Sequence, residues 1–169
     1  MELRKWTQAD AEALCALCNA IDRRYLSDRI PFPYTLKDAH WWLDEVARQE
    51  GANGIFRAVW VDSKLVGSIS VEQKSDVFRK DAEIGYFLLD SFQKQGIMTN
   101  AVRQICDLAF STLDLLRISA MIYSPNIASQ RVVEKNSFTK EGFMKKAVFK
   151  NGETYDLYIY GKLKSFGEE

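Results

Sequence analysis

The chain has 169 residues, of which 47% are hydrophobic and 27% are charged, and its 23 Lys and Arg residues balance 23 Asp and Glu residues. This size and composition predict one globular domain over residues 1–169, and the balanced charge argues against recruitment by nucleic acid or an acidic membrane. The sequence shows no signal-peptide pattern, no apolar run near the roughly 20 residues that span a bilayer, and an odd number of cysteines. We therefore expect a cytoplasmic protein without a disulfide framework.

Strand and helix patterns follow one another along the chain in a definite order. Apolar and β-branched runs predict strands at 2–6, 55–61, 65–71, 84–89, 117–123, 143–150 and 153–163. Apolar residues at helical spacing predict helices that begin near Thr7, Thr35, Met98 and Asn126. The order β-α-α-β-β-β-α-β-α-β-β predicts an α+β domain with a largely antiparallel sheet, closed by a hairpin at Asn151-Gly152.

The segment 22–34 lacks a regular pattern and contains two prolines, and the helix after it carries Trp41 and Trp42. Aromatic residues after such a segment could line a substrate mouth. The alternative is one tryptophan in the core and one on the surface. Cys15 and Cys18 fall inside a predicted helix and His40 is the only histidine, so we expect no metal site.

Residues 82–99 predict a buried strand, a tight turn and the opening of a helix. The run 84–89 is almost wholly apolar, which predicts a strand covered on both faces. A helix start leaves backbone N–H groups without partners, so a diphosphate laid across Gln95 to Thr99 would find donors there. With Gly96 as the only glycine of the turn, this is neither a Walker loop nor a dinucleotide motif, and an ordinary connection explains it equally well.

The residues Gln93-Lys94-Gln95-Gly96-Ile97-Met98 resemble the Gln/Arg-x-x-Gly-x-Gly/Ala pyrophosphate loop of the GNAT acetyltransferase superfamily. The flanking residues are most similar to its RimJ/RimL branch, the N-terminal acetyltransferases of ribosomal proteins and their relatives. Met98 departs from the small residue usual at the last loop position. A methionine is tolerable there if only its backbone N–H is used.

Two further blocks carry the resemblance. Residues 124–138 are similar to the family's Asn-x-x-Ser helix and the Glu-Lys-x-Gly-Phe sequence after it, with Ser137 in place of the glycine. Residues 33–39 are similar to the start of the branch's second helix. The resemblance implies a GNAT-like fold, in which a mixed, mostly antiparallel sheet is flanked by helices and splayed between its fourth and fifth strands.

The resemblance also implies acetyl-CoA as cosubstrate in that gap. The pantetheine arm would pair with the backbone of Tyr86, Phe87 and Leu88. Asn126 would bind the arm, and Ser129 would lie near the sulfur. The remaining residues expected to bind the cosubstrate, through its diphosphate, are Gln93, Lys94, Gln95, Gly96, Ile97, Met98 and Thr99.

In this family the substrate amine attacks the thioester directly, so the chain needs a base but no nucleophilic side chain. Our candidate base is Glu83, acting through water; the alternative is a structural carboxylate tied to an arginine or a backbone group. The tyrosine that often protonates the leaving thiolate is replaced by Val133, which leaves Ser129 as the donor. The candidate substrate contacts are Tyr34, Trp41, Glu83, Tyr155 and Asp156.

The predicted function is acetyl-CoA-dependent acetylation of a primary amine, either a protein or peptide N-terminal α-amine or a small amine. An α-amine has a pKa near 7.7–8.0 against about 10.4 for lysine, so freeing lysine costs roughly 3.4 kcal/mol more and the α-amine is favoured. A polyamine or aminoglycoside acceptor stays open, as does a monomer or a homodimer.

Two other classes remain as alternatives. A non-catalytic acyl-CoA-binding sensor with the same fold would fit Val133 and the uncertain base. An RNA-binding sheet with surface aromatics would require an RNP1 sequence and a basic balance, neither of which the chain has.

Overall fold

The computed structural model describes residues 1–165. The strands are β1 (Glu2–Arg4), β2 (Gly54–Val61), β3 (Lys64–Gln73), β4 (Asp81–Leu88), β5 (Arg117–Tyr123), β6 (Thr139–Lys150) and β7 (Glu153–Leu163). The α-helices are α1 (Ala11–Ala20), α2 (Leu36–Gln49), α3 (Ile97–Thr112) and α4 (Ile127–Glu134). This element order confirms the sequence prediction.

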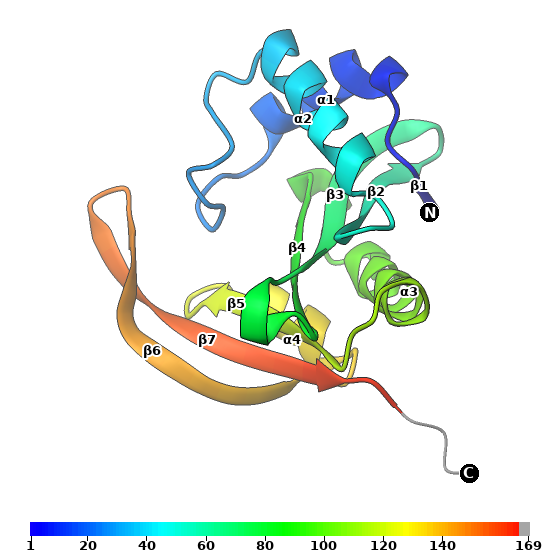
Figure 1. Ribbon diagram of the computed structural model, residues 1–169. Coiled ribbons are helices and arrows are strands. Elements are labelled where there is room, and N and C mark those ends of the chain that lie inside the picture. Colours follow the sequence, from blue (N-terminus) through cyan, green and yellow to red (C-terminus); the bar gives the residue numbers. More distant parts are fainter. Residues whose placement is uncertain (166–169) are drawn as a thin grey trace.

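The strands form one seven-stranded sheet in the order β1-β2-β3-β4-β5-β7-β6 (Figure 1). Every neighbouring pair is antiparallel except β4 and β5, which run parallel. Their register covers only Asp81–Glu83 against Arg117–Ser119. Beyond it, β4 stays paired with β3 and β5 with β7, so the two strands part, and the predicted splay between the fourth and fifth strands is confirmed.

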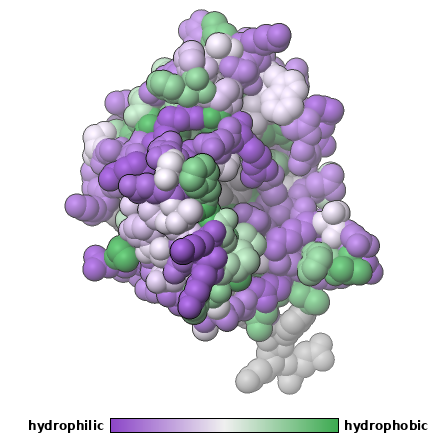
Figure 2. Space-filling view, turned by 90° about the vertical axis from the view of Figure 1, so that its left-hand side faces the viewer, coloured by the Kyte–Doolittle hydropathy of each residue, from purple (hydrophilic) through white to green (hydrophobic). Residues whose placement is uncertain are grey.

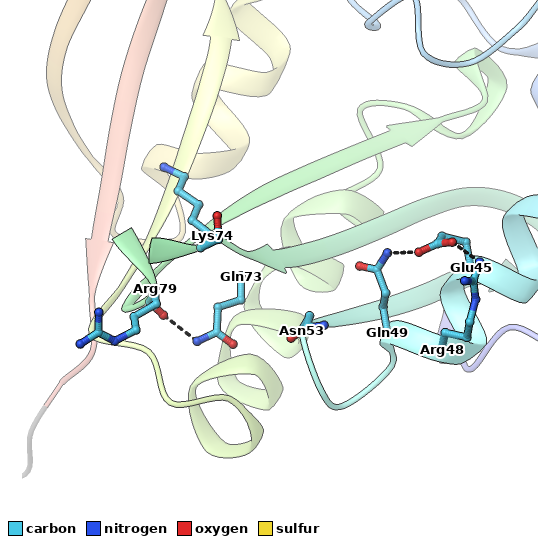
Figure 3. A pocket seen from close by; sticks show the side chains of 8 residues that line it. Glu45, Arg48, Gln49, Asn53, Gln73, Lys74 and Arg79 are labelled. Carbon is cyan, nitrogen blue, oxygen red and sulfur yellow. Dashed lines mark hydrogen bonds and ion pairs between the residues drawn. The ribbon is translucent and has the colours of Figure 1, made fainter. Parts of the chain in front are cut away.

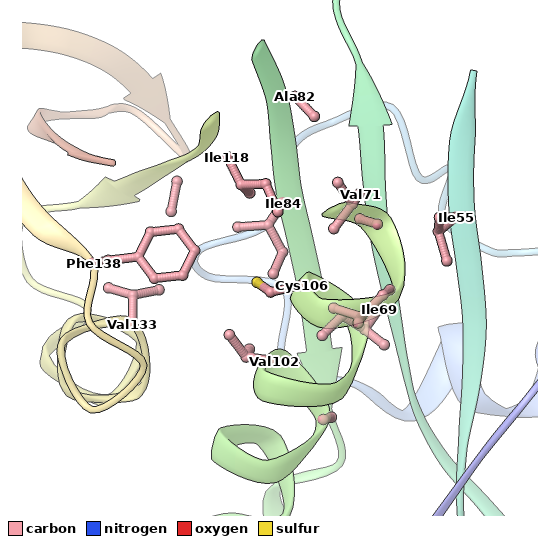
Figure 4. Close-up of a cluster of buried hydrophobic side chains, with 14 of the residues drawn as sticks. Ile55, Ile69, Val71, Ala82, Ile84, Val102, Cys106, Ile118, Val133 and Phe138 are labelled. Atoms are coloured by element: carbon pink, nitrogen blue, oxygen red, sulfur yellow. The ribbon is translucent and has the colours of Figure 1, made fainter. Parts of the chain in front are cut away.

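Helices cover the two faces of the sheet because alternate residues of a strand point to opposite sides. On one face, α3 packs on β2 and β3 and α4 packs on β5. The core there includes Ile69, Ile84, Val102 and Val133 (Figure 4). On the other face, α1 and α2 pack over a second core that includes Phe56, Ala58 and Leu65.

One prediction about β4 is wrong. The strand is not covered on both faces: Ala82 and Ile84 are buried, whereas Glu83 and Gly85 are exposed. The layer of α1 and α2 reaches Phe87 but leaves the first half of β4 open to solvent on that side. The run is apolar although only one face of the strand is buried along its first half. An apolar run alone does not distinguish a strand covered on one face from a strand covered on both.

The predicted caps and turns agree with the backbone. Thr35 and Asp38 form a capping box at the start of α2, and the Asn126 side chain caps α4. Asn151 and Gly152 both have positive φ, 51° and 82°, as a tight hairpin turn needs. Several strand boundaries differ from the prediction by two residues or more: β1 ends at Arg4, β3 extends to Gln73, β4 begins at Asp81 and β6 begins at Thr139.

The two neighbouring tryptophans differ in burial, since Trp42 is partly buried and Trp41 is exposed. Trp42 packs edge-on against Trp6, with ring centroids 5.2 Å apart, while Trp41 is 64% exposed. In residues 1–165, no helix is both long and apolar enough to span a membrane.

Candidate active site

The open edge of β4 forms one wall of the candidate site. Past Glu83 no neighbouring strand pairs with β4 on its β5 side within residues 1–165, so backbone groups of residues 84–88 are available along the gap. On the far side, α4 follows β5. The Tyr86 hydroxyl donates to the backbone oxygen of Ser129 at 3.3 Å and so links the two walls. Burial raises the pKa of Tyr86, which keeps the phenol protonated as the donor.

The turn after β4 is shaped by two residues with positive φ, Lys94 at 59° and Gly96 at 75°. The Gln93 amide donates to Asp90 Oδ1 at 2.9 Å, and the Gln95 amide donates to the backbone oxygen of Ser91 at 3.0 Å. These side chains hold the turn to the segment before it. A Cβ on Gly96 would meet nothing within 4 Å, so glycine is required by the left-handed backbone and not by crowding.

The first turn of α3 presents unused donors. Gly96 precedes the helix without a side-chain cap, and the first bond to its carbonyl comes from the N–H of Asn100, at 3.0 Å. Among the described residues nothing accepts from the N–H groups of Ile97, Met98 or Thr99. These donors and the helix dipole suit a diphosphate. The Met98 side chain is 6% exposed and lies in the core, which explains why a large residue is tolerated there.

The α4 wall contributes the other predicted pair. Asn126 Oδ1 accepts from the N–H of Ser129 at 3.2 Å, so this side chain fixes the start of the helix. Ser129 is half-buried, and no group in residues 1–165 hydrogen-bonds to its hydroxyl. Val133 is fully buried in the core beneath α4. A tyrosine there would have to displace packed side chains, and a donor role for Ser129 stays a prediction.

A buried amide that the sequence analysis missed joins the two helices beside the gap. Asn136 donates to the backbone oxygen of Thr99 at 3.1 Å and to that of Val132 at 2.9 Å. It therefore ties the first turn of α3 to the last turn of α4. Ser137, beside it, has φ of 64°, the conformation that favours glycine, which is the residue usual at this position in the resembled motif.

Glu83 lies at the last register pair between β4 and β5, opposite Ser119. Its carboxylate is exposed and has no hydrogen bond or ion pair within residues 1–165, so the alternative of a tied structural carboxylate finds no partner. Glu72 on β3 stands opposite it in register and on the same face, and accepts from the Ser70 hydroxyl at 3.1 Å. The sequence analysis missed Glu72, because the pairing of two strands is not visible in either strand alone.

The predicted acceptor contacts lie in different places. Tyr34 is 7% exposed and packs in the core with α1 and α2, and Trp41 lies on the surface of α2. The Tyr155 ring stacks on Tyr123, with centroids 6.3 Å apart, and Tyr25 meets Tyr123 edge-on at 6.1 Å. A role for any of them in substrate binding stays a prediction.

Asp156 already has a structural partner. Its carboxylate accepts from the backbone N–H of Lys146 at 2.8 Å, inside the irregular part of β6. On the face that carries the β6–β7 hairpin and segment 22–34, hydrophilic residues predominate around a smaller group of hydrophobic ones (Figure 2). An acceptor that approached from this side would cross a mostly polar surface.

A separate hollow lies at the far ends of α2 and β3 (Figure 3). Its cationic side chains do not converge, because Arg48 pairs with Glu45 and Lys74 pairs with Asp81. None of the predicted site residues lines it. No cluster of three potential metal ligands occurs in the described part of the chain.

Comparison with known proteins gives a consistent result. Residues 1–139 match the family model of an acetyltransferase (GNAT) domain. The chain is similar to the probable N-acetyltransferase YjcK of Bacillus subtilis (strain 168), with 40% identity over 116 residues, 69% of this chain and 63% of that protein. It is also similar to the putative ribosomal N-acetyltransferase YdaF of the same strain, with 37% identity over 112 residues, 66% of this chain and 61% of that protein. Both matches span less than two thirds of the relative's length.

Among solved structures, the chain is similar to RimL, a ribosomal L7/L12 alpha-N-protein acetyltransferase in complex with coenzyme A. The TM-score is 0.84, with 25% identity, over 95% of this chain and 92% of that chain.

Proposed function

The chain belongs to the GNAT acetyltransferase family, and from that premise we propose that it transfers an acetyl group from acetyl-CoA to a primary amine. The observation that carries the proposal is the gap between β4 and β5. Its one wall is an unpaired strand edge, and that wall leads directly to the uncapped N-terminus of α3. Such a site can hold an extended polar chain that ends in a diphosphate.

Acetyl-CoA would lie along this path. The diphosphate would accept from the N–H groups of residues 97–99, and the pantetheine arm would hydrogen-bond to the edge of β4 near Tyr86 to Leu88. The similarity to RimL, whose structure contains coenzyme A, supports this placement. Asn126 would bind the arm from the opposite wall through its amide N–H₂, because its Oδ1 already caps α4.

The acetyl group would then reach the region of Glu83, where the two strands begin to part. The amine attacks the thioester carbonyl, and a backbone N–H of β4 stabilises the oxyanion of the tetrahedral intermediate. Glu83, acting through water, takes the proton of the amine, and Ser129 donates to the departing thiolate. General acid–base groups of this kind contribute about 10²–10⁴-fold to the rate.

We propose a protein or peptide N-terminal α-amine as the acceptor. Its pKa suits a site with a single solvent-exposed base, and the names of YdaF and RimL associate those relatives with ribosomal proteins.

One observation favours a second candidate, a small polycationic amine. Glu72 and Glu83 face each other across β3 and β4 without a cation within ion-pair distance in residues 1–165. Like charges directly opposite repel, and a second ammonium group on the substrate would relieve that repulsion.

Thiol release from acetyl-CoA, measured with peptide and polyamine panels, tests the function. We expect turnover with at least one panel, and a loss of about 10²-fold in kcat for Glu83→Gln with unchanged coenzyme A affinity. Glu12→Gln is the matched control, because Glu12 on α1 is likewise exposed and has no ion pair in residues 1–165. Coenzyme A binding without thiol release across both panels would overturn the enzyme assignment and favour a sensor.

The same assay separates the two acceptors. If the acceptor is polycationic, Glu72→Gln should raise KM for it several-fold. For a peptide that carries only its α-ammonium group, the change should be small.

A further inference from the structure

A network of five side chains occupies the closed end of the gap, where β4 and β5 are still paired: Lys74, Asp81, Arg117, Ser119 and Glu141. Asp81 is at its centre. The Ser119 hydroxyl lies 2.6 and 2.7 Å from the two carboxylate oxygens of Asp81, and Lys74 Nζ lies 2.6 Å from Oδ2. Ser119 is only 3% exposed, so this hydrogen bond lies inside the sheet.

Arg117 extends the network across the next two strands. Its Nε lies 3.5 Å from Asp81 Oδ1, and its Nη2 lies 2.6 Å from Glu141 Oε2 on β6. The strand between them, β7, contributes Gly161. A Cβ there would come within 2.6 Å of Arg117 Nη2 and would also collide with Glu141. Glycine at this position leaves the space that the ion pair fills.

The position of the network coincides with the end of backbone pairing. Asp81 is the register partner of Arg117, and Glu83 is the register partner of Ser119. The next residues of β4 have no partner on β5. The side-chain network therefore joins β4 and β5 at the same residues at which their backbone pairing ends.

We propose that this network is a positioning clamp, which fixes the angle at which β4 and β5 part and so holds the two walls of the gap at the spacing that acetyl-CoA requires. None of the five residues need touch the cosubstrate. The clamp acts through Glu83 on one strand and through α4, with Ser129, on the other. Since a misplacement of about 1 Å can cost roughly 10²-fold in rate, a loosened clamp should be visible in catalysis.

The first test measures the gap itself and does not depend on the proposed function. Spin labels at Ser91→Cys and Ile127→Cys, both exposed, report the distance between the open ends of the walls. Cys15→Ser removes the one half-exposed native thiol, since Cys18 and Cys106 are buried. We expect one narrow distance distribution, which broadens or shifts in Ser119→Ala and in Asp81→Asn. An unchanged distribution in both variants would overturn the proposal, whether or not the protein binds acetyl-CoA.

The control is Glu45→Ala, which removes an ion pair with Arg48 inside α2, outside β4 and β5. It should leave the distribution unaltered. If it broadens the distribution as much as Ser119→Ala does, the effect is general loosening and the clamp is refuted.

The second test follows binding and turnover. Ser119→Ala should raise Kd for coenzyme A and KM for acetyl-CoA about five-fold or more, at a temperature where thermal unfolding shows the variant fully folded. Asp81→Asn keeps an acceptor for the Ser119 hydroxyl and should lose less than Asp81→Ala. Should Asp81→Ala fail to fold, Ser119→Ala decides alone. Values within two-fold of wild type in a folded Ser119→Ala would contradict the clamp.

Discussion

The two ends of the gap between β4 and β5 differ in the polar groups that line them. At the closed end, side chains join the strands through the Asp81–Ser119 hydrogen bonds and the pairs of Asp81 with Lys74 and Arg117. At the open end, the main groups are backbone donors of residues 97–99 without partners in the described chain. At the closed end the carboxylates of Asp81 and Glu141 have side-chain partners, although the buried Arg117 Nε makes no hydrogen bond to any described residue. At the open end the backbone donors have none.

The difference suggests two roles: the closed end fixes the position of the two strands, and the open end offers donors to an anion. A network of partly buried charges that pair with one another favours one geometry of the sheet, because moving either strand would break those pairs. Unsatisfied backbone donors at a helix start remain available to an anion and require no side-chain rearrangement. We therefore expect the closed end to hold the two strands in place and the open end to bind the ligand.

The largest expected effect is at the open end. Gly96→Ala should destabilise the fold by about 1–2 kcal/mol, since φ of 75° is unfavourable for a side chain, and weaken coenzyme A binding at least ten-fold. Gly152→Ala is the matched control, because Gly152 has φ of 82° and equally open surroundings but lies in the β6–β7 turn. Calorimetric titration and thermal unfolding of both variants separate strain from binding. Equal losses of affinity would contradict the assignment of Gly96 to the site.

A smaller effect on coenzyme A affinity is expected for Tyr86, whose side chain crosses the gap. Tyr86→Phe removes the hydroxyl that donates to the Ser129 backbone oxygen and should cost about 0.5–1.5 kcal/mol of unfolding free energy. Coenzyme A affinity should fall only about two- to three-fold, because the backbone of β4 is unchanged. Urea denaturation and calorimetry check both values. A loss of affinity as large as that of Gly96→Ala would show that the phenol itself binds the ligand.

The smallest expected effect is a gain in stability, whereas the two preceding substitutions should destabilise the protein. Ser137→Gly relieves a positive φ of 64° just after α4 and should stabilise the protein by about 1 kcal/mol, or raise Tm by about 2–4 °C, with turnover unchanged. Ser27→Gly is the control, since φ of Ser27 is not positive, and it should not stabilise. A stabilised variant with reduced turnover would indicate that the strain at Ser137 serves the site.

The sequence predicted those parts of the site that are local in the chain. The loop 93–99 depends on one glycine and the start of a helix, and the Asn126 cap depends on residues three apart. The element order followed from apolar periodicity, because each helix and strand buries a face of its own. These features need no knowledge of what lies across the sheet.

The parts that could not be predicted depend on register. Glu72 lies opposite Glu83 only because the register of β3 and β4 makes these two residues partners. Asp81, Ser119 and Glu141 come from three separate segments, and their network appears only in the assembled sheet. Tyr34, the last residue of segment 22–34, was a predicted substrate contact; its burial between α1 and α2 depends on packing that the sequence of the segment does not show.

The most direct test of the whole account is amide hydrogen exchange with and without acetyl-CoA. Because the cosubstrate is proposed to bind the edge of β4 and the first turn of α3, exchange should slow in peptides that cover 84–88 and 96–99 and stay unchanged at the Asn151-Gly152 turn. Binding without protection of these two segments, or no binding at all, would contradict the placement of acetyl-CoA between β4 and β5.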